Sequence, residues 1–112
     1  MKFGLPNATY QLLQNYFRQQ SAVEKVIIYG SRAMGTQEPA SDIDLALVVN
    51  EDDATEAFFL IAQIKTELEE LPTPYRFNVI NLGTLKHDGL RDHIARVGKV
   101  FYEWDRKASL KK

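Results

Sequence analysis

The sequence predicts a small α/β (α+β) domain, a mixed β-sheet flanked by helices. Segments with helical spacing of apolar residues alternate along the chain with short β-branched and aromatic segments, which is the pattern of helices packed on a sheet. The length of 112 residues is that of one domain, and 45% hydrophobic residues supply one modest core. No linker or repeat divides the chain, so residues 1–104 are assigned to a single domain and the polar residues 105–112 to a tail.

The first half of the chain predicts one helix and two strands. Apolar residues recur at helical spacing over residues 7–20. Residues 25–29 are β-branched and aromatic and stop at Gly30, which indicates a buried strand. Residues 31–41 contain Gly, Pro, Thr and Ser, which favours a loop with one helical turn. Residues 42–50 alternate and then become fully apolar, as expected of a central strand whose first end meets solvent.

The second half predicts two helices and two more strands. A helix begins after Asp53, a favourable N-cap residue, and ends before Pro72. Its apolar stripe, expected to face the core, consists of Ala57, Phe58, Ile61, Ile64, Leu68 and Leu71. Residues 75–81 predict a third strand, residues 86–97 a last helix, and residues 100–102 a short edge strand.

Charge and residue usage exclude several classes of function. A formal charge of −1 leaves no basic excess for neutralising phosphates, so direct binding of nucleic acid is not expected. Cysteine is absent, which excludes disulfides, thiolate catalysis and cysteine-ligated zinc. The two histidines, His87 and His93, cannot hold a structural zinc alone and are assigned to a solvated or half-buried helix face. No signal peptide or membrane span is recognisable, so a cytoplasmic protein without membrane contact is expected.

The chemically informative residues are Gly30 and Ser31, followed after ten residues by Asp42 and Asp44. Glycine at a strand end lets the backbone approach a phosphate closely, and Ser31 adds a hydroxyl and an N–H group. Two aspartates spaced two apart on a strand project from one face, where their mutual repulsion favours a bound cation such as Mg²⁺. Gly-Ser turns and Asp-x-Asp pairs are each common as purely structural features. Their joint position around two predicted strands predicts a nucleotide or metal site.

The same residues resemble a known family. IIYGSRAMG followed by SDIDLAL is similar to the signature of the minimal nucleotidyltransferases, small relatives of the DNA polymerase β superfamily. The resemblance extends over nearly the whole chain and implies a nucleotidyltransferase fold, similar to the palm of polymerase β. Many such proteins resemble the antitoxin halves of two-gene systems whose partner is a small all-helical toxin of the HEPN type. The resemblance therefore implies Mg²⁺-dependent transfer of AMP from ATP to a tyrosine of that toxin, within a hetero-oligomer.

The resemblance also implies roles for individual positions. Gly30, Ser31 and Arg32 match the turn that grips the phosphates of the nucleotide. Asp42 and Asp44 match the two carboxylates that hold the metal, two Mg²⁺ ions in the family, and are the candidate catalytic residues. The short chain leaves no room for a domain that binds an acceptor, so the acceptor is expected on another protein.

The third predicted strand departs from the family's pattern. The family carries a third carboxylate in a segment of the form Arg-Val-Asp-Val-Val-Asp, whereas residues 76–81 read RFNVIN. Asn78 stands where the third aspartate belongs, either as a residual ligand or as a structural amide. Its neutral amide has no basicity, so proton removal from an attacking hydroxyl is expected to be weakened. The alternative function is therefore a catalytically weakened or inactive subunit that neutralises its partner by forming a complex.

Overall fold

The computed structural model describes residues 2–104, which form a four-stranded mixed sheet with helices on both faces. The elements in chain order are α1 (Asn7–Arg18), β1 (Val23–Tyr29), α2 (Ser31–Met34), β2 (Ile43–Val49), α3 (Ala54–Glu70), β3 (Phe77–Asn81), the 3-10 turn η1 (Leu82–Thr84), α4 (Asp88–Val97) and β4 (Lys99–Glu103). The predicted fold class and the predicted order of elements are confirmed. The predicted tail, residues 105–112, lies outside the described residues. Between residues 2 and 104, no helix combines the length and the apolar character that crossing a bilayer requires.

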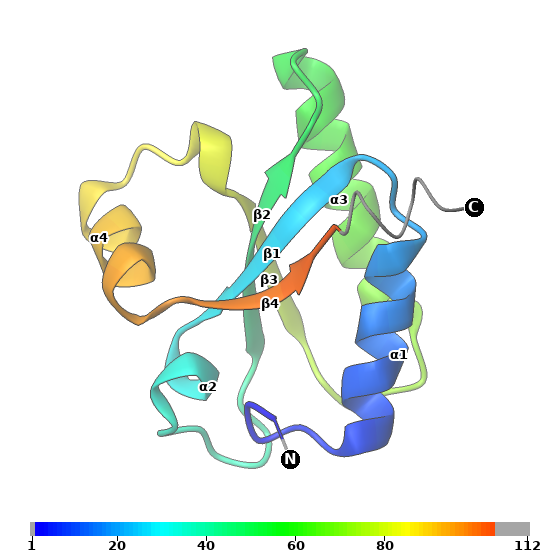
Figure 1. The fold of residues 1–112 in the computed structure, drawn as a ribbon, viewed down its shortest axis with the longest axis vertical. Coiled ribbons are helices and arrows are strands. Elements are labelled where there is room, and N and C mark those ends of the chain that lie inside the picture. Colours follow the sequence, from blue (N-terminus) through cyan, green and yellow to red (C-terminus); the bar gives the residue numbers. More distant parts are fainter. Residues whose placement is uncertain (1, 105–112) are drawn as a thin grey trace.

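The strands lie in the order β3-β2-β1-β4. β1 runs antiparallel to both β2 and β4, whereas β2 and β3 are parallel. A parallel pair needs a crossover connection, and α3 supplies it (Figure 1). The apolar β2 is central, as its sequence predicts, and the starts of β2 and β3 lie side by side at one end of the sheet.

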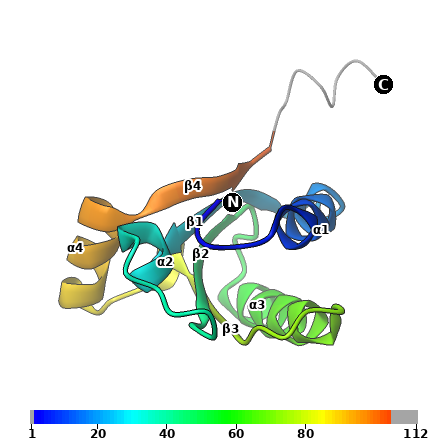
Figure 2. The same cartoon turned by 90° about the horizontal axis from the view of Figure 1, so that it is seen from below.

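The two faces of the sheet are covered unequally (Figure 2). α1 and α3 pack on one face, where the larger core includes Phe17 and Leu68. The other face is covered by α4, and its smaller apolar cluster is built on Tyr29, Ala46 and Ile94. The short α2 lies on this side of the sheet as well (Figure 2), and Asp42 and Asn78, at the starts of β2 and β3, are exposed.

The helix α3 begins where the sequence predicts, but one residue of its predicted stripe is exposed. The side chain of Asp53 accepts a hydrogen bond from the N–H group of Glu56 at 3.0 Å and so caps the helix. The prediction that Phe58 faces the core is wrong, because 69% of this residue is exposed and its ring packs edge-on against Phe59. Phe58 follows the buried Ala57 by one position, a rotation of about 100° around the helix, which carries it off the narrow buried stripe.

Candidate functional site

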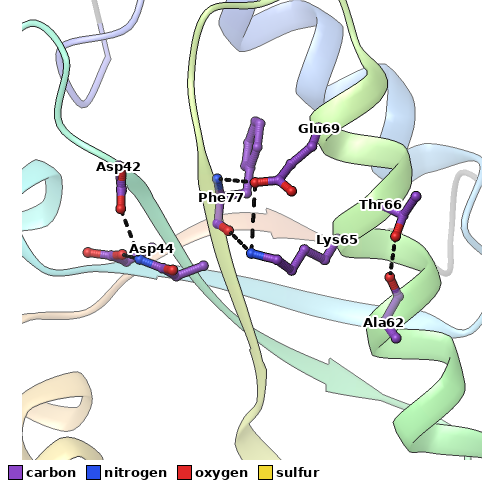
Figure 3. A network of polar contacts seen from close by, with 8 residues as sticks. Asp42, Asp44, Ala62, Lys65, Thr66, Glu69 and Phe77 are labelled. Carbon is purple, nitrogen blue, oxygen red and sulfur yellow. Dashed lines mark hydrogen bonds and ion pairs between the residues drawn. The ribbon is translucent and has the colours of Figure 1, made fainter.

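Asp42, Asp44 and Asn78 meet at the starts of two parallel strands. Asp42 immediately precedes β2 and Asp44 is its second residue, so both side chains leave the same face of the sheet. The parallel register pairs Asp44 with Asn78 of β3. The amide nitrogen of Asn78 donates to Oδ1 of Asp44 at 2.7 Å and to Oδ2 of Asp42 at 3.4 Å (Figure 3). The two predicted carboxylates therefore converge on the side chain that replaces the third aspartate.

The edge strand that carries Asn78 is held in place by α3. Lys65 Nζ donates a hydrogen bond to the carbonyl of Phe77 at 2.8 Å, and the N–H group of Phe77 donates to Glu69 Oε2 at 3.3 Å (Figure 3). An edge strand has backbone groups without a strand partner, and these two side chains satisfy them. They fix the backbone one residue before Asn78, which sets where its amide lies.

The three side chains form a donor set that fits Mg²⁺. Rotation of an asparagine amide presents either its NH₂ group or its carbonyl oxygen, and two facing carboxylates select the NH₂ group. The amide hydrogens then offset the repulsion between Asp42 and Asp44, a task that a cation performs equally well. Mg²⁺ prefers oxygen ligands and keeps positions for water and phosphate. Across residues 2–104 no group of three or more His, Asp or Glu side chains could hold a metal, so a cation at this cluster would have Asp42 and Asp44 as its two charged ligands.

Gly30 brings the end of β1 against this cluster. Its backbone has a φ of +71°, and a Cβ atom at this position would overlap Oδ2 of Asp44. Both features require glycine. Ser31 then begins α2, so its hydroxyl and N–H group follow directly after the point where the backbone meets the carboxylate. The structure thus brings the Gly30 backbone beside Asp44, with Ser31 next along the chain.

Replacing Gly30 with alanine tests this close approach. We expect Gly30→Ala to lower the free energy of unfolding by about 2–4 kcal/mol, because a φ of +71° with a ψ of −154° suits only glycine and a Cβ atom would overlap Asp44. Gly35→Ala is the control, because Gly35 lies in the ordinary left-handed region, with a φ of +79° and a ψ of 14°, and has open space around it. It should cost about 1–2 kcal/mol, the left-handed strain alone. Equal losses in urea denaturation of the two variants would contradict the larger cost expected at Gly30.

Arg32 points into the loop that follows α2 and bonds the carbonyl of Ser41, the residue before Asp42. Only 2% of this residue is exposed, and its guanidinium donates to the carbonyls of Phe3, Pro39 and Ser41. The guanidinium carbon also lies 4.9 Å from the ring centre of Tyr75. Four hydrogen bonds and a stacked ring give Arg32 a structural role, that of holding residues 31–41 against the N-terminal segment. The resemblance places this residue at the phosphates, and in this structure its guanidinium is engaged with backbone carbonyls.

The buried position of Arg32 predicts a large stability effect. We expect Arg32→Met to lower the free energy of unfolding by about 2–4 kcal/mol, because it removes four partly buried hydrogen bonds to backbone carbonyls. Arg91→Met is the control. Arg91 donates to the carbonyls of Leu82 and Leu85 but is exposed, so water can replace it at a cost below about 1 kcal/mol. Thermal denaturation of both variants measures the difference, and a loss no larger for Arg32→Met than for Arg91→Met would reject this role.

Two further residues adjoin the cluster, and no sequence pattern assigns either of them to the site. Tyr29 pairs with Asp44 in the antiparallel register and is buried. Burial, followed by the charge of Asp44, raises the pKa of Tyr29 to about 12. His93 of α4 contacts the Tyr29 ring edge-on, and its Nε2 accepts a hydrogen bond from the N–H group of Gly30 at 3.3 Å. The only signal in the sequence is helical spacing, which puts His93 beside the inward-facing Ile94.

The raised pKa of Tyr29 predicts alkaline destabilisation. Folding raises this pKa from 10.0 to about 12, so the native state keeps a proton that the unfolded state loses. The resulting contribution to stability is complete below pH 10 and disappears as the pH rises through 12. From pH 9 to 11 the free energy of unfolding of the wild type should fall by about 1 kcal/mol more than that of Tyr29→Phe. Parallel urea titrations of the two proteins check this, and identical pH dependence would contradict it.

A comparison with protein families identifies the fold that carries this cluster. The family model described as "Polymerase beta, Nucleotidyltransferase" matches residues 11–107. The chain belongs to the polymerase β nucleotidyltransferase family. No curated protein matches the chain.

Solved structures show the same polymerase β nucleotidyltransferase fold. A toxin–antitoxin structure with AMP-PNP aligns with a TM-score of 0.57 and 18% identity, over 94% of this chain and 80% of that one. The MntA–HepT toxin–antitoxin aligns with a TM-score of 0.54 and 14% identity, over 94% and 79%. A tri-AMPylated HEPN toxin in complex with its MNT antitoxin, from Shewanella oneidensis, aligns with a TM-score of 0.52 and 16% identity, over 90% and 78%. The fold predicted from the resemblance is confirmed.

Proposed function

We propose that this chain is a Mg²⁺-dependent nucleotidyltransferase that transfers AMP from ATP to a tyrosine hydroxyl of a small helical HEPN-type toxin, and so acts as an antitoxin. The observation that carries the proposal is the convergence of Asp42 and Asp44 on Asn78, against the Gly30 backbone. Family membership supports nucleotidyl transfer in general. The similar structures support the acceptor class, because one of them contains an AMPylated HEPN toxin and another contains AMP-PNP.

Each part of the site has a role in the proposed reaction. Asp42 and Asp44 hold Mg²⁺, which when bound neutralises triphosphate charge and lowers the pKa of the attacking hydroxyl. Ser31 binds the β- and γ-phosphates through its N–H group and hydroxyl, and Gly30, which has no Cβ atom, lets the backbone approach them closely. The tyrosine oxygen of the partner forms a bond to the α-phosphorus, the bond from that phosphorus to the β-phosphate oxygen breaks, and pyrophosphate leaves. Asn78 cannot take the hydroxyl proton, which passes to solvent or to a group of the partner.

The openness of the site supports an acceptor on another chain. α4 and the short α2 lie on this face of the sheet, and the cluster lies at the end next to α2, where β2 and β3 begin (Figure 2). Asp42 and Asn78 are exposed and Asp44 is half-buried. A protein acceptor would cover the open side and exclude water from the reaction. ATP as donor places the reaction in the cytoplasm, in a hetero-oligomer of the two chains.

Asn78 favours a second candidate function. A neutral amide in place of a carboxylate suits a binding subunit that neutralises the toxin by forming a complex with it. Such a subunit uses the pocket only to sense nucleotide, or does not use it at all. Under this function the Asp42→Ala, Asp44→Ala double variant still neutralises its partner. Under the proposed transferase function the double variant does not.

Incubation with radiolabelled ATP tests the choice. The protein, Mg²⁺ and the product of the adjacent gene are combined with ATP labelled at the α-phosphate, and label on a partner tyrosine is expected. The double variant is the control and should leave the partner unlabelled and toxic. An unlabelled partner that the wild type still neutralises would establish the binding function instead.

A further inference from the structure

His93 touches the glycine of the candidate phosphate-binding turn, although 63 residues separate the two in sequence. The N–H group of Gly30 donates to Nε2 of His93 at 3.3 Å. The His93 ring also meets the Tyr29 ring, with centroids 6.2 Å apart and planes at 81°. α4 therefore contacts two consecutive residues at the end of β1 through a single half-buried side chain.

The turn needs such support because glycine is its most flexible point. Gly30 is held at a φ of +71°, with its backbone against Asp44. Glycine loses more conformational freedom on ordering than any other residue, so each contact that fixes it lowers the cost of ordering the turn for a ligand. The bond to His93 holds the Tyr29–Gly30 peptide, and Ser31, the first residue of α2, follows directly after the glycine.

The chemical nature of the hydrogen-bond acceptor that meets the Gly30 N–H group also matters. The ring nitrogen of a neutral histidine accepts a hydrogen bond without bringing a negative charge. A carboxylate in its place would add a charge near Asp44 and repel the phosphates of a nucleotide. The buried Tyr29 ring, which pairs with Asp44 in the sheet, also contacts the imidazole edge-on.

We propose that His93 is a positioning residue that ties α4 to Gly30 and holds the Gly30–Ser31 turn ready for the triphosphate of a nucleotide. This role rests on the proposed function for its ligand, but the fixing of the turn by His93 can be observed without any ligand. Loss of the His93 side chain should weaken nucleotide binding, because part of the binding free energy is then spent on ordering the turn.

Three variants separate this role from simple packing. His93→Phe keeps a ring against Tyr29 and removes the acceptor, and His93→Leu serves where the phenyl ring prevents folding. His93→Gln places an amide oxygen near the former Nε2 and restores the acceptor. His87→Asn is the control on the same helix, because His87 is exposed and caps α4 through Nδ1, a task that asparagine also performs.

The experiment combines calorimetry of ATP binding in Mg²⁺ with amide exchange of Gly30 measured by NMR in the free protein. We expect His93→Phe to weaken ATP binding by about five- to tenfold and to speed Gly30 exchange by a similar factor. His93→Gln and His87→Asn should stay within about twofold of the wild type on both readouts. Unchanged binding and exchange in His93→Phe and His93→Leu would overturn the proposal.

The two readouts also separate this role from the proposed function. If the wild type fails to bind ATP, the proposed function fails, and Gly30 exchange decides the positioning role alone. If the Gly30 amide exchanges faster in His93→Phe and at the wild-type rate in His93→Gln, the result supports the fixing of the turn by His93. If the Gly30 amide exchanges at the same rate whether or not residue 93 carries a hydrogen-bond acceptor, the positioning role is rejected.

Discussion

Replacing Asn78 with aspartate is expected to raise the rate of nucleotidyl transfer by about 10²–10⁴-fold, the usual contribution of a general base. The change puts a third carboxylate beside Asp44 and Asp42, where the Asn78 amide now donates at 2.7 and 3.4 Å. Three carboxylates repel one another without a cation, so the variant should also depend more steeply on Mg²⁺. Label transferred from ATP to the partner over time, at several Mg²⁺ concentrations, measures both effects.

The control for this variant is Asn81→Asp. Asn81 lies on the same strand three positions later, so its side chain leaves the opposite face. Its side chain accepts from the N–H group of Gly83 at 2.9 Å, a bond that aspartate keeps. The control adds the same charge to β3 without adding it to the cluster, and its transfer rate should equal that of the wild type. A rate for Asn78→Asp no higher than that of Asn81→Asp would contradict the role assigned to the third position.

Replacing Asp44 with asparagine is expected to weaken Mg²⁺-dependent ATP binding and transfer by at least about 100-fold. Loss of a residue that only hydrogen-bonds a metal ligand costs about 10- to 100-fold, and loss of a ligand itself should cost more. Asp44 is the centre of the cluster, since it pairs with both Tyr29 and Asn78 and adjoins Gly30. Removing its charge removes one of two carboxylate ligands. The fold should tolerate the change, because the Asn78 amide can rotate to bond the new side chain. Calorimetry of ATP binding with and without Mg²⁺ measures the loss.

Asp52→Asn is the matched control for that charge change. Asp52 is an exposed carboxylate in the connection between β2 and α3, away from the cluster. It should bind ATP as the wild type does. If Asp44→Asn and Asp52→Asn lose affinity equally, the effect is one of net charge, and the carboxylate at the start of β2 has no special role.

Local sequence signals were sufficient for most of the fold. β-branched runs, helical periodicity and the Asp53 cap depend on neighbours within a few residues, and the elements that they predict are present. The shared face of Asp42 and Asp44 also follows from strand geometry alone. The meeting of these two with Asn78 needed one further fact, the parallel pairing of β2 and β3.

What the sequence could not provide depends on contacts between distant segments. The motif places Arg32 at the phosphates, but its burial among carbonyls from three segments depends on how the loop folds back. Periodicity includes Phe58 in the stripe of α3, but how narrow the buried stripe is depends on the sheet beneath it. The bond from Gly30 to His93 joins the end of β1 to α4, and no local pattern signals it.

The most direct test of the site is a crystal structure of the protein with Mg²⁺ and a non-hydrolysable ATP analogue. Oxygens of Asp42 and Asp44 should coordinate the ion at about 2.1 Å, with the phosphates of the analogue on the same ion and against Gly30 and Ser31. A nucleotide bound elsewhere on the sheet, or an ion that contacts neither carboxylate, would contradict the account.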